Sequence, residues 1–108
     1  MNFIRPNWSA PTNVKAVSTI RKGGISRGVF SDFNLGLHVG DEAELVKQNR
    51  QSLECDLGLN HSPLWLNQVH STTLVTADDS LGDLPTADGS FTNKPNIVCV
   101  VMTADCLP

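Results

Sequence analysis

Residues 97–104 (IVCVVMTA) constrain the fold most, because their apolar side chains fall on both faces of an extended chain. A strand of this kind needs cover on both sides, as in a sheet packed between two layers. The segment ends only four residues before Pro108. The rest of the sequence predicts one helix and about five short strands, too little to cover it. We therefore expect residues 1–108 to be the N-terminal portion of a single, larger domain.

A single helix is predicted over residues 42–57. Asp41, with Glu44 three residues later, has the form of an N-cap with a capping box. Leucine and valine residues then recur at helical spacing as far as Leu57, and Gly58 is a suitable stop.

Extended segments rich in β-branched or apolar residues account for most of the remaining chain. Strands are predicted over residues 14–20, 64–70, 72–77, 89–92 and 97–104. Residues 21–40 form a glycine-rich, aperiodic loop, and ordered loops of such length are often functional.

Composition and charge exclude several classes of function. Eight basic and eleven acidic side chains give a net charge of −3 with no basic stripe, so nucleic acid is not expected as a partner. No apolar run approaches the roughly 20 residues that span a bilayer, so no membrane partner is expected either. The N-terminal residues lack the layout of a signal peptide, and three cysteines cannot all pair. We expect a cytoplasmic protein.

Two side chains lie where predicted strands meet loops. Cys106 follows the strand over residues 97–104, and His70 closes the strand over residues 64–70. Reactive groups are often carried at such positions, where a rigid element feeds a loop. Strand alternation would also place Gln68 beside His70 on one face.

The other cysteines and histidines are not assigned a chemical role. Cys99 falls in the middle of a predicted strand and is interpreted as an inert core thiol. Cys55, inside the predicted helix, is also interpreted as structural, and His61, in a polar turn, as solvated. His38 lies in the glycine-rich loop, and its role stays open.

A thiol and an imidazole at strand ends are compatible with two chemistries, or with purely structural roles. In the first chemistry, His70 activates Cys106 as a nucleophile. In the second, thiolate and imidazole bind a divalent metal such as zinc. Catalytic zinc usually takes three protein ligands, so at least one ligand would be unaccounted for. The residues alone do not decide between these possibilities.

Four segments, in this order, resemble one family. They are IRKGGIS (residues 20–26), NLGLHVGD (34–41), WLNQVH (65–70) and MTADCLP (102–108). The chain resembles the YfiH/YlmD family, also called the laccase-domain or polyphenol oxidoreductase family and, in bacteria, peptidoglycan editing factor. A small departure is Ile20, where relatives often have threonine.

The resemblance implies an α+β fold, a layered α/β sandwich with a mixed sheet similar to the catalytic domain of cytotoxic necrotizing factor. It implies a zinc site with His70 and Cys106 as catalytic ligands and a later histidine that lies outside residues 1–108. Arg21 and Asn34 would line the substrate pocket, with Arg21 facing phosphate or ribose.

The implied activity is zinc-dependent phosphorolysis of purine nucleosides (adenosine, inosine, guanosine and methylthioadenosine), with adenosine deamination as a second reaction. The implied partners are therefore a purine nucleoside and phosphate. A role in peptidoglycan editing is implied by the resemblance alone. Copper oxidation of phenols, which the laccase name suggests, is disfavoured because three histidines cannot furnish a multicopper cluster.

Two alternatives to this reading stay open. The similarity to a Cys-His hydrolase leaves a metal-free mechanism with Cys106 as nucleophile and His70 as base. The chain could also be an inactive fragment, because it holds only part of the implied site.

Overall fold

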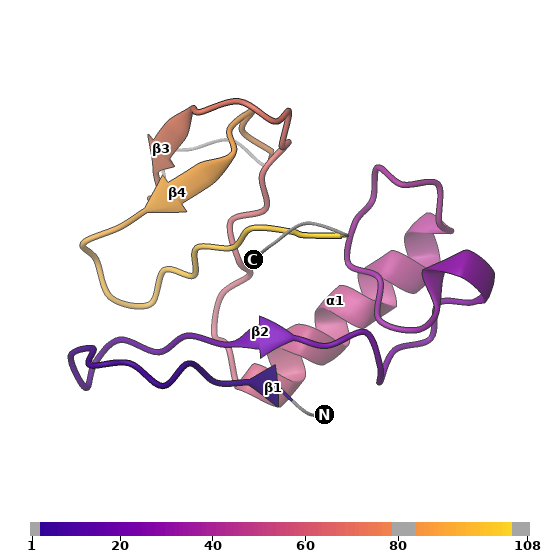
Figure 1. Ribbon diagram of the computed structural model, residues 1–108, viewed down its shortest axis with the longest axis horizontal. Helices are drawn as coiled ribbons and strands as arrows, with labels where there is room; N and C mark the ends of the chain where they lie inside the picture. The colour runs from indigo at the N-terminus through magenta and orange to yellow at the C-terminus, as the bar shows by residue number, and fades with distance from the viewer. Residues whose placement is uncertain (1–2, 79–83, 105–108) are drawn as a thin grey trace. The chain divides into compact units, whose positions relative to one another are not determined.

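The computed structural model describes residues 3–78 and 84–104, which form two compact units, Met1–Asp56 and Leu57–Pro108. Cys106 therefore lies outside the described residues. The elements, in chain order, are β1 (Phe3–Ile4), β2 (Ser18–Thr19), a 3-10 helix η1 (Gly28–Phe30), α1 (Ala43–Leu57), β3 (Leu74–Thr76) and β4 (Gly89–Phe91) (Figure 1). This combination of one helix with small sheets is an α+β fold.

The helix α1 is the main element of the first unit. Its residues Val46, Asn49 and Leu53 are buried, and their spacing of three and four places them on one helical face. Gly58 has a φ of 64°, the left-handed conformation that commonly ends a helix. The helix predicted from the sequence is thus confirmed to within one residue at its start.

The predicted capping box is wrong. The carboxylate of Asp41 accepts a hydrogen bond from the N–H of the next residue, Glu42, at 2.8 Å. It also accepts from the side chains of Ser26 and Asn34, while Glu44 accepts from Gln48 at 3.5 Å. Asp41 therefore ties the preceding loop to the start of α1 instead of closing a box with Glu44.

The sheet of the first unit is short. β1 and β2 pair antiparallel, with Phe3 opposite Thr19 and Ile4 opposite Ser18. The strand predicted over residues 14–20 is reduced to β2, because β1 offers only two residues for pairing.

The second unit is built on a parallel pair. β3 and β4 align Leu74 with Gly89 and Thr76 with Phe91. These strands confirm the predictions over residues 72–77 and 89–92, with shorter limits. Among the described residues of this unit, the buried apolar side chains include Trp65, Leu66, Ala77 and Ala87.

Residues 64–70 and 97–104 do not form the continuous strands that the sequence predicts. Isolated parallel bridges join Leu64 to Cys99 and Asn67 to Thr86. A single bridge supplies far fewer backbone hydrogen bonds than a ladder. These segments are therefore extended chains that pair with a neighbouring segment at isolated residues only.

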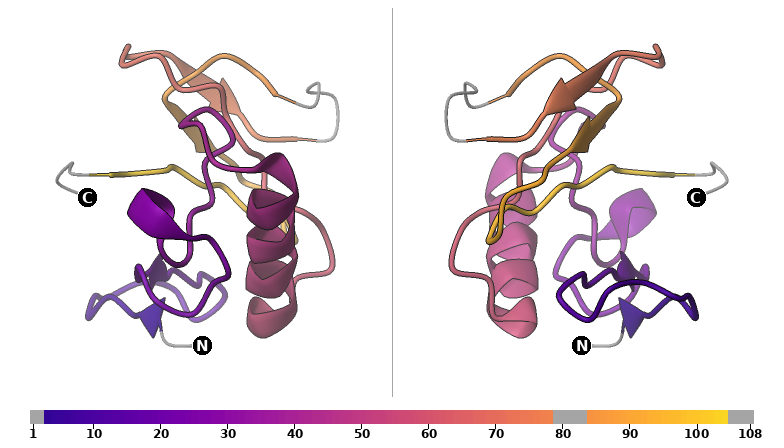
Figure 2. Two further views of the ribbon diagram at one scale, coloured as in Figure 1. Left: turned by 90° about the vertical axis from the view of Figure 1, so that its right-hand side faces the viewer. Right: turned by 90° about the vertical axis from the view of Figure 1, so that its left-hand side faces the viewer.

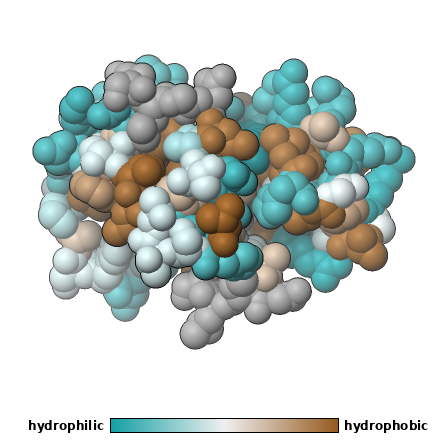
Figure 3. Space-filling model, turned by 90° about the horizontal axis from the view of Figure 1, so that it is seen from above, coloured by the Kyte–Doolittle hydropathy of each residue, from teal (hydrophilic) through white to brown (hydrophobic). Residues whose placement is uncertain are grey.

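The described residues do not cover residues 97–104 on both faces: Val101 is 56% exposed, and Cys99, interpreted from the sequence as a core thiol, is exposed. This exposure agrees with the expectation that residues 1–108 alone supply too little chain to cover the segment. Within the described residues, one bridge, to Leu64, pairs this segment. Cys55 lies in α1 as predicted but is exposed, and His61 is exposed as predicted. Figure 3 shows apolar side chains reaching the surface among polar ones.

Within the described residues, no helix is both long enough and apolar enough to cross a bilayer.

Candidate functional site

His70 lies in a tight turn. Its φ is 61°, in the left-handed region that residues with a Cβ rarely adopt, and its side chain is exposed. The left-handed conformation interrupts the alternation of an extended strand. The prediction that Gln68 and His70 share one strand face is therefore wrong, although His70 does lie at the end of an extended segment.

The carboxylate of Asp88 holds this turn together. Its Oδ1 accepts hydrogen bonds from the N–H groups of Val69 (2.9 Å) and His70 (2.7 Å). Its Oδ2 accepts from the N–H (2.9 Å) and the Oγ (2.5 Å) of Ser71. These bonds, led by that of the Ser71 hydroxyl, lower the pKa of Asp88 although burial opposes them.

Gln68 connects the same segment to residues that precede Cys106. Its Nε2 donates to the carbonyl oxygen of Met102 at 3.1 Å, and the N–H of Met102 donates to its Oε1 at 2.8 Å. Met102 lies four residues before Cys106 in the sequence. The sequence predicted the two segments that carry the candidate ligands, but not this side-chain connection between them.

In the first unit, Arg21 shapes the glycine-rich loop. Its Nε donates to the carbonyl oxygen of Ser31 at 2.6 Å. Its own carbonyl oxygen accepts from the N–H groups of Asp32 (3.1 Å) and Phe33 (2.8 Å). The Arg21 side chain is otherwise exposed, with its terminal nitrogens open to solvent or ligand in the described part of the chain.

Asn34, the other predicted pocket residue, makes contacts within the same loop. Its Oδ1 accepts from the N–H of Gly36 at 3.0 Å, and its Nδ2 donates to the Gly36 carbonyl oxygen at 3.2 Å. Nδ2 also donates to Asp41 at 3.1 Å. The amide of Asn34 is thus used to fold the loop back on itself.

Asn49 fastens this loop to α1 and was missed from the sequence. It is 1% exposed, and its Oδ1 accepts from the N–H of Ile25 at 3.0 Å. Its Nδ2 donates to Ser26 Oγ (2.9 Å) and to the carbonyl oxygen of Asn34 (2.8 Å). The sequence does contain a signal for this role, because Asn49 occupies a position on the apolar face of the helix. A polar side chain that is buried there needs hydrogen-bond partners.

The next helical residue, Arg50, adds a contact between α1 and the loop. Its Nε donates to the carbonyl oxygen of Leu35 at 2.9 Å. Burial lowers the pKa of Arg50, and the nearby charge of Glu54 opposes that shift. Figure 2 shows the loop running beside α1 within this unit.

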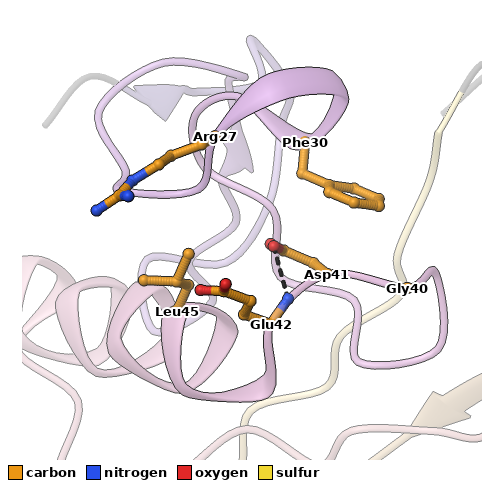
Figure 4. A pocket seen from close by; sticks show the side chains of 6 residues that line it. All are labelled: Arg27, Phe30, Gly40, Asp41, Glu42 and Leu45. Atoms are coloured by element: carbon orange, nitrogen blue, oxygen red, sulfur yellow. Dashed lines mark hydrogen bonds between the residues drawn. The ribbon is translucent and has the colours of Figure 1, made fainter.

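A shallow pocket of about 210 Å³ opens where the loop meets α1. It is lined by Arg27, Phe30, Gly40, Asp41, Glu42 and Leu45 (Figure 4). Ligand sites usually enclose about 300–1,000 Å³, so this pocket is small for a nucleoside. None of the predicted site residues lines it.

A metal cluster is not completed by the described residues. Across residues 3–78 and 84–104, no three His, Cys, Asp or Glu side chains lie close enough to hold one ion. Of the predicted ligand pair, only His70 falls in this part of the chain. His38 and His61 are exposed there.

Comparison with known proteins agrees with the resemblance seen in the motifs. A family model described as multi-copper polyphenol oxidoreductase laccase matches residues 15–108. A Haemophilus influenzae protein named purine nucleoside phosphorylase is 49% identical over 108 residues, which cover 100% of this chain and 44% of that protein. A Pseudomonas aeruginosa protein of the same name is 43% identical over 110 residues, covering 98% and 42%.

Solved structures show the same relationship. A Neisseria meningitidis protein described as DUF152 has a TM-score of 0.88 and 46% identity, covering 98% of this chain and 43% of that one. YlmD from Geobacillus stearothermophilus has a TM-score of 0.73 and 26% identity, covering 89% and 43%. The chain thus spans less than half the length of these relatives. On the family match and these identities, the chain belongs to the YfiH/YlmD family of laccase-domain (DUF152) proteins.

Proposed function

We propose that the protein is a zinc-dependent purine nucleoside phosphorylase and that residues 1–108 supply part of its active site. The observation that carries this proposal is the 49% identity, over the whole of this chain, to a protein named purine nucleoside phosphorylase. The polyphenol oxidoreductase description of the family model is the competing name. We favour the nucleoside reaction because two relatives that match at least 98% of this chain carry that name, and because the three histidines of residues 1–108 do not by themselves supply a multicopper cluster.

The proposed reaction is group transfer. An oxygen of inorganic phosphate forms a bond to C1′ of the ribose while the bond from C1′ to the purine nitrogen breaks. The purine leaves with the electron pair and takes up a proton, so the products are the free base and the sugar 1-phosphate, which is ribose 1-phosphate for an unmodified nucleoside. Adenosine, inosine, guanosine and methylthioadenosine are the proposed substrates. Deamination of adenosine is proposed as a second activity. In that reaction the oxygen of water takes the place of the 6-amino group, which leaves as ammonia.

His70 and Cys106 are proposed as zinc ligands. The fit of His70 is supported by its exposed imidazole, because the Asp88 contacts engage only its backbone N–H. Imidazole together with thiolate is a donor set that zinc prefers. Zinc, when bound, would supply Lewis-acid polarisation of an oxygen on the substrate or of a water molecule.

Arg21 is proposed to bind phosphate. Its Nε donates to the carbonyl oxygen of Ser31, and the side chain is exposed, so the terminal nitrogens can reach a ligand. Arginine binds phosphate oxygens through paired hydrogen bonds. Asn34 is proposed to shape the pocket wall through its contacts with Gly36 and Asp41.

The test is an assay of the protein as its gene encodes it. Inosine and inorganic phosphate are supplied, and the release of hypoxanthine is measured. We expect about one zinc per chain and an activity that a chelator abolishes. Cys106→Ala and His70→Ala should lose both zinc and activity. Cys55→Ala and His61→Ala are matched controls, because both wild-type residues are exposed, and they should keep both properties.

Three outcomes would overturn the proposal. Stoichiometric zinc in Cys106→Ala would remove Cys106 from the ligand set. Activity that survives the chelator but is lost on alkylation of Cys106 would indicate the metal-free cysteine mechanism. Strong phenol oxidation by copper-free protein, without nucleoside cleavage, would favour the oxidase name.

A further inference from the structure

Three consecutive backbone N–H groups, from Val69, His70 and Ser71, converge on one carboxylate. Both oxygens of Asp88 are used, because Oδ1 accepts two of these bonds and Oδ2 accepts the third together with the Ser71 hydroxyl. Successive N–H groups that point to one side form a concave site suited to an anion. Here the anion is a side chain of the protein itself.

The backbone of His70 has a reason to adopt its left-handed conformation. A φ of 61° is unfavourable for a residue with a Cβ, and histidine has no intrinsic need for it. The same conformation turns the N–H groups of His70 and Ser71 toward Asp88. Charge-assisted hydrogen bonds to the carboxylate therefore offset the backbone strain.

Asp88 is itself held by a regular element. Its N–H donates to the carbonyl oxygen of Thr73 at 2.9 Å, and the residue immediately precedes β4. β4 is paired in parallel register with β3, which follows the turn. The carboxylate is thus carried by the start of one strand and closes the turn that leads into the other.

We propose that Asp88 is a positioning residue that sets the place of the His70 imidazole by binding the backbone of residues 69–71. This inference rests on the proposed function, in which His70 is a zinc ligand. Asp88 does not ligate the metal in this proposal. It acts by restricting the turn, so that His70 is presented in one backbone conformation before metal or substrate arrives.

The test compares Asp88→Asn with Ser71→Ala and with Glu44→Gln. Asp88→Asn keeps the shape of the side chain but replaces one acceptor oxygen by an NH₂ group that opposes the N–H donors of the turn. Ser71→Ala removes the hydroxyl bond to Asp88 and the longer contacts, at 3.3 Å, of that hydroxyl with the N–H and Oγ1 of Thr73, but keeps the three backbone bonds to Asp88. Glu44→Gln is a matched control, because it makes the same carboxylate-to-amide change at an exposed position of α1.

Two readouts are made on the protein as its gene encodes it. The first is hydrogen exchange of the amides of residues 69–71 in zinc-free protein, where Asp88→Asn should exchange at least about tenfold faster than wild type. The second is zinc affinity by competition with a chelator, where loss of a supporting contact should cost about 10–100-fold. Ser71→Ala should show smaller effects of the same kind, and Glu44→Gln should match wild type.

The outcomes separate this inference from the proposed function. Unchanged exchange at residues 69–71 in a folded Asp88→Asn variant overturns the inference, whatever the enzyme does. Faster exchange with unchanged zinc affinity also overturns it, because the turn would then not control the ligand. Absence of zinc from wild-type protein overturns the proposed function and the metal-positioning role together, while the exchange data still decide whether Asp88 holds the turn. If Asp88→Asn fails to fold, the graded result from Ser71→Ala decides the matter, and wild-type values in that variant count against the inference.

Discussion

The side-chain amide of Gln68 pairs with the backbone of Met102 as a neighbouring strand would. The N–H of Met102 donates to Oε1 at 2.8 Å and Nε2 donates to the Met102 carbonyl oxygen at 3.1 Å. One side chain therefore does at this point what a β ladder does elsewhere. The consequence is that, beyond the bridge between Leu64 and Cys99, one side chain makes the second connection between these two chain segments.

Replacing Gln68 by leucine should lower the free energy of unfolding by about 1–3 kcal/mol, because it leaves the N–H and carbonyl groups of Met102 without partners. Urea unfolding of the protein as its gene encodes it measures the effect. Gln51→Leu, at an exposed position of α1, is the control and should change the midpoint little. Equal midpoints for the two variants would show that the Gln68 pair contributes nothing.

Asn49→Ala should be among the more damaging single changes in the first unit. It removes hydrogen bonds to Ile25, Ser26 and the Asn34 carbonyl from a residue that is 1% exposed. We expect a loss of about 2–4 kcal/mol, which exceeds the usual effect of a point mutation. Thermal unfolding checks the loss, with exposed Gln48→Ala on the same helix as the control. A loss no larger than that of the control would contradict the role assigned to Asn49.

Asp41 should make stability depend on acid pH. Its pKa is held below the ordinary range of a carboxyl group, chiefly by the hydrogen bond from Ser26, although burial opposes the shift. The unfolded state then binds more protons in acid, so this contribution is complete above the unfolded pKa and is lost as the pH falls through the folded pKa.

The prediction for Asp41→Asn is therefore a shallower loss of stability as the pH falls from about 5 to about 3. Unfolding midpoints measured across this range test it, and Glu42→Gln, the exposed neighbouring change, should keep the wild-type slope. Asp88, whose pKa is also lowered, keeps some acid dependence in every variant. A wild-type slope in Asp41→Asn would be the contrary result.

Gly24→Ala should be destabilising because the added Cβ has no room. It would clash with the carbonyl oxygen of Asp32 and lie 2.6 Å from Phe33 Cα and 2.7 Å from Asn49 Oδ1. Overpacking of this kind costs about 1–3 kcal/mol. Gly28→Ala is an informative comparison, since its φ of 63° brings strain but no neighbour lies within 4 Å in the described part of the chain. Urea midpoints of the two variants separate close contact from strain, and a harmless Gly24→Ala would refute the contact argument.

Cys99 should react with iodoacetamide in the 108-residue chain at a rate similar to that of Cys55. Both thiols are exposed, whereas a thiol buried in a strand between two layers would be protected. Mass spectrometry after timed alkylation gives the two rates, and Cys99→Ser identifies the signal. Slow labelling of Cys99 beside fast labelling of Cys55 would restore the interpretation of Cys99 as a core thiol.

Local patterns in the sequence were enough to predict α1, β3 and β4. The helix follows from apolar positions three and four residues apart and from a glycine at its end. The two strands follow from short runs of residues suited to a pleated chain between turn residues. In each case the information lies within the segment itself.

The contacts that shape the candidate site could not be predicted in the same way. Asp88 binds residues 17 to 19 positions earlier, and Gln68 binds a residue 34 positions later. No local periodicity encodes such pairs. For residues 97–104 the sequence did not predict the interrupted pairing or the exposure of Cys99, because an apolar pattern indicates what a segment can bury and not which partners are present to bury it.

The left-handed turn at His70 has a consequence for how this family of sites can vary. The turn is secured through main-chain groups and a carboxylate, and the imidazole takes no part in it. Asparagine or glycine, which tolerate that conformation, could stand at position 70 without disturbing the scaffold. Under the proposed function, reactivity and architecture are thus separable here: one substitution at His70 would remove the proposed zinc ligand and leave the turn intact.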